Sequence, residues 1–422
     1  GNLLQQLYNT ADTIIVGNFN GQQALSAVGA CASLTVLFTA LAIGFSIGAG
    51  VLISQYFGAS REQELRQYAA TAIVLMLAMG LLMSLIGVCS ARFLLARALG
   101  TPEALPLTLL YFRIYAAGLV FQFGYNIAAA LLRALGDSKA TLYFLLVSSV
   151  LNVVLDLAFV AGLGMGVAGA AIATVLSQIA SCVIGFAYMH RRYALLRFSL
   201  RELRMDLKTA GRILQVGAPM AIQQSIVSCG FLFLQRLVNY YGESMIASYT
   251  VASRMENILM IPIIGIQNTM ATFAGQNMGA QRPDRVSKGL GQGVLVSLGM
   301  TLILCLAQIA GIPLIIRAFQ LDAGAADICR LHLFSSAVAI PIFAVYFPAN
   351  GMCQGVGEGF HATFYALLAL GLRVVFAYAL HKTSLFGYTA IWWSQAMSWT
   401  ITLVVCYVHF FRGKWKDKSL IS

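Results

Sequence analysis

Two aspartates stand inside long apolar stretches of this 422-residue sequence, where a charged side chain is costly. Asp12 lies in YNTADTIIVG and Asp156 lies in SSVLNVVLDLAFVAG. A charge at the centre of a membrane-spanning helix costs about 2.5 to 3.5 kcal/mol on insertion scales, so acids in such positions are functional candidates by default. A carboxylate there can take up a proton or Na⁺ and release it again. Asp12 and Asp156 are therefore our candidates for ion coupling.

Polar side chains accompany Asp156 at helical spacing. Ser149, Asn152 and Asp156 are three and four residues apart, which places them in one stripe on a helix. A Na⁺ ion in this region would use Asp12, Asn152 and Asp156. Neighbouring apolar stretches carry similar polar faces, and a surface that met only lipid would not need them. The alternative roles are helix capping near water and hydrogen bonding between helices. We predict that a cavity is lined by Tyr111, Asn126, Asn152, Thr174, Gln178, Gln224 and Arg373.

The composition is that of an integral membrane protein. Hydrophobic residues make up 59% of the chain and charged residues only 10%, whereas soluble proteins average about 25% charged residues. Several apolar stretches exceed the roughly 20 residues that span a bilayer as a helix, and none shows the alternation typical of a membrane β-barrel strand. We predict an all-α membrane protein with twelve spans, near residues 1–17, 24–54, 68–95, 107–132, 139–163, 167–189, 213–240, 245–275, 289–316, 328–352, 361–381 and 387–411.

The sequence contains an internal duplication. When residues 17–70 are moved forward by 221 positions, Gln55 falls on Gln276 and Gly58 falls on Gly279; the same shift carries the pair 136–137 onto 357–358. A two-fold repeat in so apolar a chain is typical of transporters. We predict two pseudo-symmetric six-helix lobes. The expected divisions are an N-lobe at 1–189 with its first helix truncated at the start, a linker at 190–212, a C-lobe at 213–411 and a tail at 412–422.

Basic residues gather in the linker, in the tail and in the loops on the same side of the predicted membrane. Because Lys and Arg accumulate in cytoplasmic loops, both termini are expected to face the cytoplasm. The net charge of +12 is spread over these short loops. Topology explains it better than binding to nucleic acid.

The residues that enzymes use are scattered. No HExxH, GxSxG or Walker motif is present, and the sequence shows no cluster of acids with histidines. The eight cysteines have no metal-binding spacing, so we expect them to be apolar fillers, with no metal and no cofactor. Arg254 and Glu256 are two residues apart and cannot face the same way, so each is expected to pair with a loop or a neighbouring helix. The five histidines are His190, His332, His361, His381 and His409. We therefore expect no enzymatic activity and no ATP-driven transport by this chain.

The order of several motifs resembles the multidrug and toxic compound extrusion (MATE) family along nearly the whole chain. They are LLQQLYNTADTIIVGNFNGQQALSAVG, the QYFGA and QNMGA pair, LRALGDSKAT, LNVVLDLAF and GVAGAAIAT. The acid in the first span and the Gln-then-Gly-Ala helix ends are most similar to the bacterial DinF-type branch. The resemblance implies a V-shaped, twelve-helix molecule that exports cationic or amphipathic compounds in exchange for protons or sodium ions.

The resemblance also assigns roles. It places the coupling ion on Asp12 and Asp156, and it matches the accompanying polar positions of the family to Tyr111, Asn126, Asn152 and Thr174. Other branches use carboxylates in the spans that correspond here to 213–240 and 328–352, whose cores contain no Asp or Glu in this sequence. Ion coupling in the N-lobe is therefore expected.

The expected setting is a monomer in the bacterial inner membrane. Its partners are the lipid bilayer and small organic cations or amphipathic drugs. A flippase for lipid-linked oligosaccharides is the alternative with the same fold; its anionic cargo would require several basic residues in the cavity, where only Arg113, Arg236 and Arg373 are candidates. The sequence leaves open the substrate, the choice between H⁺ and Na⁺, and the role of Arg373.

Overall fold

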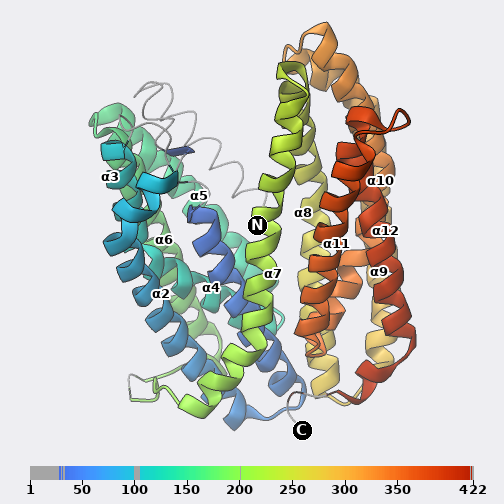
Figure 1. Cartoon of the computed structure of the whole chain (residues 1–422). Coiled ribbons are helices and arrows are strands. Elements are labelled where there is room, and N and C mark those ends of the chain that lie inside the picture. The colour runs from blue at the N-terminus through green and yellow to red at the C-terminus, as the bar shows by residue number, and fades with distance from the viewer. Residues whose placement is uncertain are drawn as a thin grey trace. The chain divides into compact units, whose positions relative to one another are not determined.

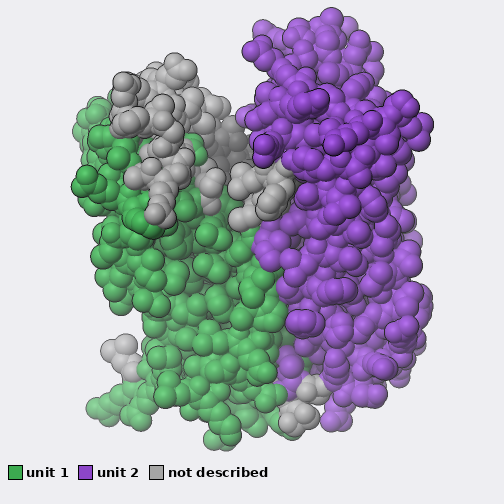
Figure 2. Space-filling view, in the orientation of Figure 1, with its two compact units in different colours: residues 1–225 green, residues 226–422 purple. Residues whose placement is uncertain are grey.

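A computed structural model of the chain describes residues 28–29, 31, 34–98, 105–199, 201–418 and 420 (Figure 1). Within these ranges the secondary structure is helical, with short turns between the helices. The chain divides into two compact units, residues 1–225 and 226–422, which Figure 2 shows in different colours. The boundary falls inside the helix α7 (Leu207–Tyr240).

Unit 1 consists of long helices joined by short turns. In chain order they are the helix Leu34–Gly58, α2 (Glu62–Ala98), α3 (Leu105–Ala117), α4 (Leu119–Ala134), α5 (Ser138–Asp156), the π-helical turn η2 (Leu157–Gly162), α6 (Gly166–Arg192), the short 3-10 helix η3 (Ala194–Leu196) and the first part of α7.

Unit 2 also consists of long helices joined by short turns. After the end of α7 it contains α8 (Glu243–Gly279), α9 (Pro283–Ala318), α10 (Ala323–Gly355), α11 (Gly359–Leu380), the 3-10 turn η4 (Gly387–Thr389), α12 (Ala390–Phe411) and the 3-10 turn η5 (Lys414–Asp417).

Eight described helices are long and apolar enough to cross a membrane, and a ninth span results if α3 and α4 are counted together. The sequence predicts one continuous span at 107–132, but the structure breaks it at Gly118 with a bend of 43°. A side-chain carbon at Gly118 would collide with Val175 of α6, so the close approach of α6 at the bend requires a residue without a Cβ atom. The predicted span at 1–17 lies outside the described residues.

The internal repeat is visible in the backbone itself. Positive φ angles recur at the same offset of 221 residues, at turns that end or begin helices. The matched pairs are Ser60 (55°) and Gln281 (55°), Gly136 (95°) and Gly357 (96°), and Gly166 (63°) and Gly387 (49°). Since left-handed backbone is uncommon outside glycine, three pairs at one offset show that both halves keep the same turns.

The turn between α4 and α5 shows how such a helix end is built. Gly136 adopts the left-handed conformation, and the amide of Asp137 donates to the carbonyl of Leu132 (2.8 Å), as in a Schellman motif. The Asp137 carboxylate then caps α5 by accepting from the amide of Ala140 (3.1 Å). In unit 2 the amide of the matching Glu358 donates to a carbonyl at the same spacing (2.8 Å).

Small residues allow helices to pack closely within each unit. A Cβ atom at Gly44 or Gly48 would collide with the backbone of α7 at Ala221 and Gly217. Between membrane helices, where there is little hydrophobic drive to associate, such close backbone approach provides much of the packing energy. The helix Leu34–Gly58 therefore fits against the start of α7 through a matched pair of small-residue faces.

Candidate functional site

Asp156 is fully buried at the end of α5, with 0% of its surface exposed. The helix continues from it into the π-helical turn η2, in which the amide of Leu163 donates to the carbonyl of Ala158 (2.9 Å). Single π-helical turns are rare and are frequent at functional sites. The structure therefore places the predicted acid at an irregular point of the helix, inside unit 1.

The polar stripe on α5 faces inward. Ser149 and Asn152 are 7% and 1% exposed, whereas the intervening Val150 and Val154 are 56% and 55% exposed. Ser149 donates to the carbonyl of Leu145 (2.7 Å). Neither the Nδ2 nor the Oδ1 atom of Asn152 has a hydrogen-bond partner among the described residues. A buried amide without partners is costly, and it is a feature expected of a site that holds a ligand or an ion.

A hydrogen-bond network crosses the bend between α3 and α4. The Tyr115 hydroxyl donates to Oε1 of Gln122 (3.1 Å), and Nε2 of Gln122 donates to the hydroxyl of Thr39 on the first described helix (2.7 Å). Nδ2 of Asn126 donates to the backbone carbonyl of Gln122, one turn earlier (2.9 Å). Asn126 is thus anchored to its own helix, and it is only partly buried.

The helix α6 contacts α3, α4 and α5, and so it connects the parts of the site. Thr174 is buried on α6 and donates to the carbonyl of Ala170 (3.0 Å). Gln178 lies one turn later on the same helix. Tyr111 is 6% exposed and belongs to the apolar cluster that also contains Ala170 and Val160, a residue of the π-helical turn.

Seven of the predicted residues belong to unit 1 and are described: Tyr111, Asn126, Asn152, Asp156, Thr174, Gln178 and Gln224. Asp12 lies outside the described residues. Gln224 is half-buried on α7 at the end of unit 1, and Arg373 belongs to unit 2.

Unit 2 contains a separate cavity of about 120 Å³. Glu256 of α8 and Arg373 of α11 face it among apolar and aromatic side chains, including Phe343, Phe347 and Trp399. Since one water molecule needs about 10 to 15 Å³ of cavity volume, this cavity has room for several waters or a small polar group. It is lined by both an acid and a base, so it does not present a uniformly charged surface.

Glu256 pairs with a neighbouring helix, as predicted. Its Oε1 atom lies 3.1 Å from Nε2 of His332 on α10. The His332 ring lies between two aromatic rings, those of Tyr249 (5.7 Å between centroids) and Trp392 (4.5 Å). Arg254, in contrast, is exposed.

The expectation that no acid clusters with histidines is wrong. Besides the pair of Glu256 and His332, Glu358 lies close to His361 and His409. Glu358 and His361 are three residues apart at the start of α11, a spacing that the sequence does show, whereas His409 comes from α12 and Glu256 and His332 come from two different helices. Burial raises the pKa of Glu358, but its contacts with Lys418 and His409 outweigh burial and hold the pKa below its ordinary value.

The chain matches one protein-family model, MatE, over residues 1–158 and 219–379. It is 27% identical to "Probable multidrug resistance protein YpnP" of Bacillus subtilis, with 100% of this chain and 94% of that protein covered. It is 22% identical to "Multidrug export protein MepA" of Staphylococcus aureus, with 93% and 87% covered.

A solved structure described as "Crystal structure of MATE in the straight conformation" superposes with a TM-score of 0.90 at 26% identity, covering 98% of this chain and 92% of that one. The prediction of an all-helical membrane protein is confirmed by this match over nearly the whole chain.

Proposed function

This chain belongs to the MatE family, and from that membership we infer that it is a multidrug exporter that works by exchange with protons or sodium ions. As a member of a family of transporters it is a multi-pass membrane protein and not an enzyme. We propose cationic or amphipathic organic molecules as its substrates and the DinF-type bacterial branch as its place within the family.

The observation that carries the proposal is the burial of Asp156 beside Asn152. An ionised carboxylate in a membrane protein interior needs a counter-charge, a proton or a metal cation. Asn152, one turn away, offers a buried amide oxygen with no hydrogen-bond partner among the described residues. Such a pair can bind a proton or Na⁺ and can also favour a cationic substrate in the ion's absence.

In the proposed cycle the coupling ion and the cationic substrate compete for the negative charge of the two aspartates. With the carrier open to the outside, an ion neutralises Asp156 and Asp12 and so weakens their hold on the cationic substrate, which leaves. Rocking of the two halves then exposes the acids to the cytoplasm, where the ion dissociates. By thermodynamic linkage the substrate must weaken ion binding by the same factor as the ion weakens substrate binding.

The other residues have supporting roles in this proposal. Tyr111, Asn126, Thr174 and Gln178 line the path beside the acids, and Thr174 and Gln178 lie one turn apart on α6. Gln224 and Arg373 would contact the substrate or adjust its passage. The bias of Lys and Arg toward the linker and the tail favours cytoplasmic termini in a bacterial inner membrane.

Transport of a lipid-linked oligosaccharide is less well supported. Of the three arginines that could bind its anionic head group, Arg113 and Arg236 are exposed. Arg373 is 8% exposed and shares its cavity with Glu256. An acid in the same cavity opposes binding of a pyrophosphate.

The experiment is transport of a cationic dye in proteoliposomes under an imposed proton gradient and then a sodium gradient. We expect the wild type to respond to at least one gradient, and the double variant Asp12→Asn, Asp156→Asn to lose at least 90% of gradient-driven transport. The control is Asp327→Asn, which removes an exposed acid from the start of α10. Transport by the double variant at the wild-type rate, with normal expression, would overturn the proposal.

A further inference from the structure

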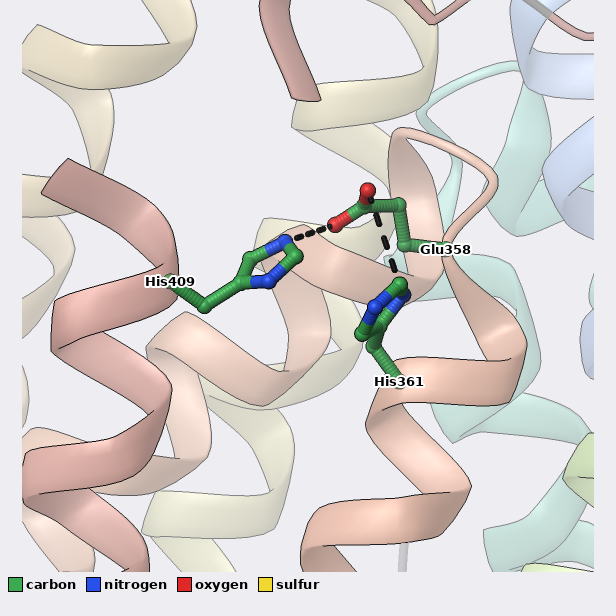
Figure 3. Close-up of side chains that lie close together, drawn as sticks. All are labelled: Glu358, His361 and His409. Atoms are coloured by element: carbon green, nitrogen blue, oxygen red, sulfur yellow. Dashed lines mark hydrogen bonds and ion pairs between the residues drawn. The ribbon is translucent and has the colours of Figure 1, made fainter. Parts of the chain in front are cut away.

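Three side chains that can bind a metal meet at one end of unit 2 (Figure 3). Glu358 lies on the turn between α10 and α11, His361 on the first turn of α11 and His409 on the last turn of α12. Nε2 of His409 is 2.7 Å from Oε2 of Glu358, and Nδ1 of His361 is 3.9 Å from Oε1. One ligand atom from each residue lies within 4.8 Å of the other two.

The cluster is held by packing around it. The side chain of Glu358 is 0% exposed, whereas those of His361 and His409 are 36% and 21% exposed, so an ion can approach from the histidine side. The following C-terminal residues pack here as well. Trp415 is fully buried and stacks on Phe410 at 5.4 Å between ring centroids.

In this structure Lys418 forms an ion pair with the carboxylate of Glu358. Its Nζ atom lies 2.8 Å from Oε1 of Glu358, and its side chain is 52% exposed. A Cβ atom at Gly357 would collide with Leu420. The C-terminal segment, residues 414–420, is thus attached to the α10–α11 turn by apolar packing and by one ion pair.

The first half of the chain provides an internal comparison. Asp137 matches Glu358 in the repeat, and it accepts a hydrogen bond from Tyr188 (2.9 Å), which matches His409: both pairs are 51 residues apart. The position that matches His361 is Ala140. The same turn is therefore held in unit 1 by a carboxylate and two tyrosines, Tyr188 and Tyr193, without any imidazole.

This comparison separates the structural role from a binding role. The acid of the turn has two side-chain partners in each half: Tyr188 and Tyr193 donate to Asp137 in unit 1, and His409 and Lys418 contact Glu358 in unit 2. His361 contributes little to holding the turn, since it lies 3.9 Å from the carboxylate. His361, which has only Ala140 at its matching position, therefore exceeds what the turn needs. Together with His409 and Glu358 it completes two imidazoles and a carboxylate, a known set of ligands for zinc.

We propose that Glu358, His361 and His409 bind a divalent transition-metal ion, with Zn²⁺ preferred, and that the ion displaces Lys418. Tetrahedral Zn²⁺ with bonds of about 2.0 to 2.1 Å requires ligand atoms roughly 3.3 Å apart. The distances of 2.7 and 3.9 Å reach different oxygens of Glu358, and one ligand atom from each residue lies within 4.8 Å of the other two. Binding therefore requires the side chains to rotate until the three ligand atoms reach the tetrahedral spacing. Water fills the fourth position. Metal binding then releases the ion pair that holds the C-terminal segment.

The test uses the full-length protein in detergent, with any affinity tag removed and metals stripped. Zn²⁺ is titrated against a chromophoric chelator, and Co²⁺ is added separately, since its visible absorption reports a tetrahedral site with nitrogen and oxygen ligands. We expect one Zn²⁺ per chain and a tetrahedral Co²⁺ spectrum. The Co²⁺ spectrum is recorded on the wild type, so this part of the test stands even if the variants do not fold.

Variants assign the site. His361→Ala and His409→Ala should each weaken Zn²⁺ binding at least tenfold, and Lys418→Ala should strengthen it several-fold by removing the competing cation. His381→Ala, a histidine at the end of α11 that is not part of the cluster, is the matched control and should change nothing. Three results would overturn the proposal. They are the absence of a tetrahedral Co²⁺ spectrum, unchanged Zn²⁺ binding in the double variant His361→Ala, His409→Ala, and weaker Zn²⁺ binding in Lys418→Ala. These measurements do not depend on transport, so they stand apart from the proposed exporter function.

Discussion

Replacement of Asn152 by leucine separates a binding role from a structural one. Asn152 is 1% exposed, and neither polar atom of its amide has a hydrogen-bond partner among the described residues. Leaving a buried polar group unsatisfied costs about 1 to 3 kcal/mol. Leucine has a similar volume and carries no polar atom, so Asn152→Leu removes that cost.

The predicted effects on stability and transport have opposite signs. We expect the unfolding free energy of Asn152→Leu to stay unchanged or to rise by about 1 to 2 kcal/mol, because an unsatisfied amide is replaced by an apolar group. If Asn152 supplies an oxygen to the coupling ion, gradient-driven dye transport should fall at least tenfold, which corresponds to about 1.4 kcal/mol.

Two assays measure these quantities. Thermal denaturation in detergent gives the change in stability, and dye transport in proteoliposomes gives the rate at equal protein content. Ser149→Ala is the matched control: Ser149 is on the same stripe, and its hydroxyl is satisfied by the carbonyl of Leu145. Transport at the wild-type rate would refute the binding role. A clear loss of stability in Asn152→Leu would show that the amide has a structural partner.

Two further predictions concern the helix ends and the close packing. Gly48→Leu should destabilise the protein by at least 1 to 3 kcal/mol, because the new side chain must displace the backbone of α7. The control Gly291→Leu should be tolerated, because a Cβ atom at Gly291 would have no atom within 4 Å. Equal melting temperatures for the two variants would contradict the close contact at Gly48. For Asp137, burial raises the pKa, but hydrogen bonds from the amide of Ala140 and from Tyr193 and Tyr188 outweigh it and hold the pKa below its ordinary value. The carboxylate therefore stabilises the fold above about pH 3.9, and this contribution is lost as pH falls through the lowered pKa. The difference in melting temperature between the wild type and Asp137→Asn should accordingly be largest near neutral pH and shrink in acid, and a constant difference would contradict this account.

Local patterns predicted what depends on one helix at a time. The spacing of Ser149, Asn152 and Asp156 predicted one polar stripe on a helix, and the structure has the three residues on one buried face of α5, because a helix repeats every 3.6 residues whatever it packs against. The offset of 221 residues likewise predicted that the turn at Gly136 would return at Gly357, and the two φ angles agree within a degree.

Features that depend on packing were missed. The contact of Gly118 with Val175 joins two helices that are far apart in the sequence, so no local pattern predicts it. The cluster of Glu358 and His409 requires the contact between α11 and α12, and no sequence spacing predicts it. The π-helical turn after Asp156 differs from an α-helix by one hydrogen-bond register, for which the sequence carries no clear signal. The available hint was the spacing of three residues between Glu358 and His361.

The buried position of Trp415 affects how this protein should be labelled. A reporter or affinity handle fused to the carboxyl terminus is usually assumed to hang from an inert extension. Here the indole nitrogen donates to the carbonyl of Phe410 (3.0 Å), and its ring is covered on all sides. Truncation before residue 415 would uncover the aromatic surface of Phe410 on which this indole stacks, and so reduce solubility in mild detergents.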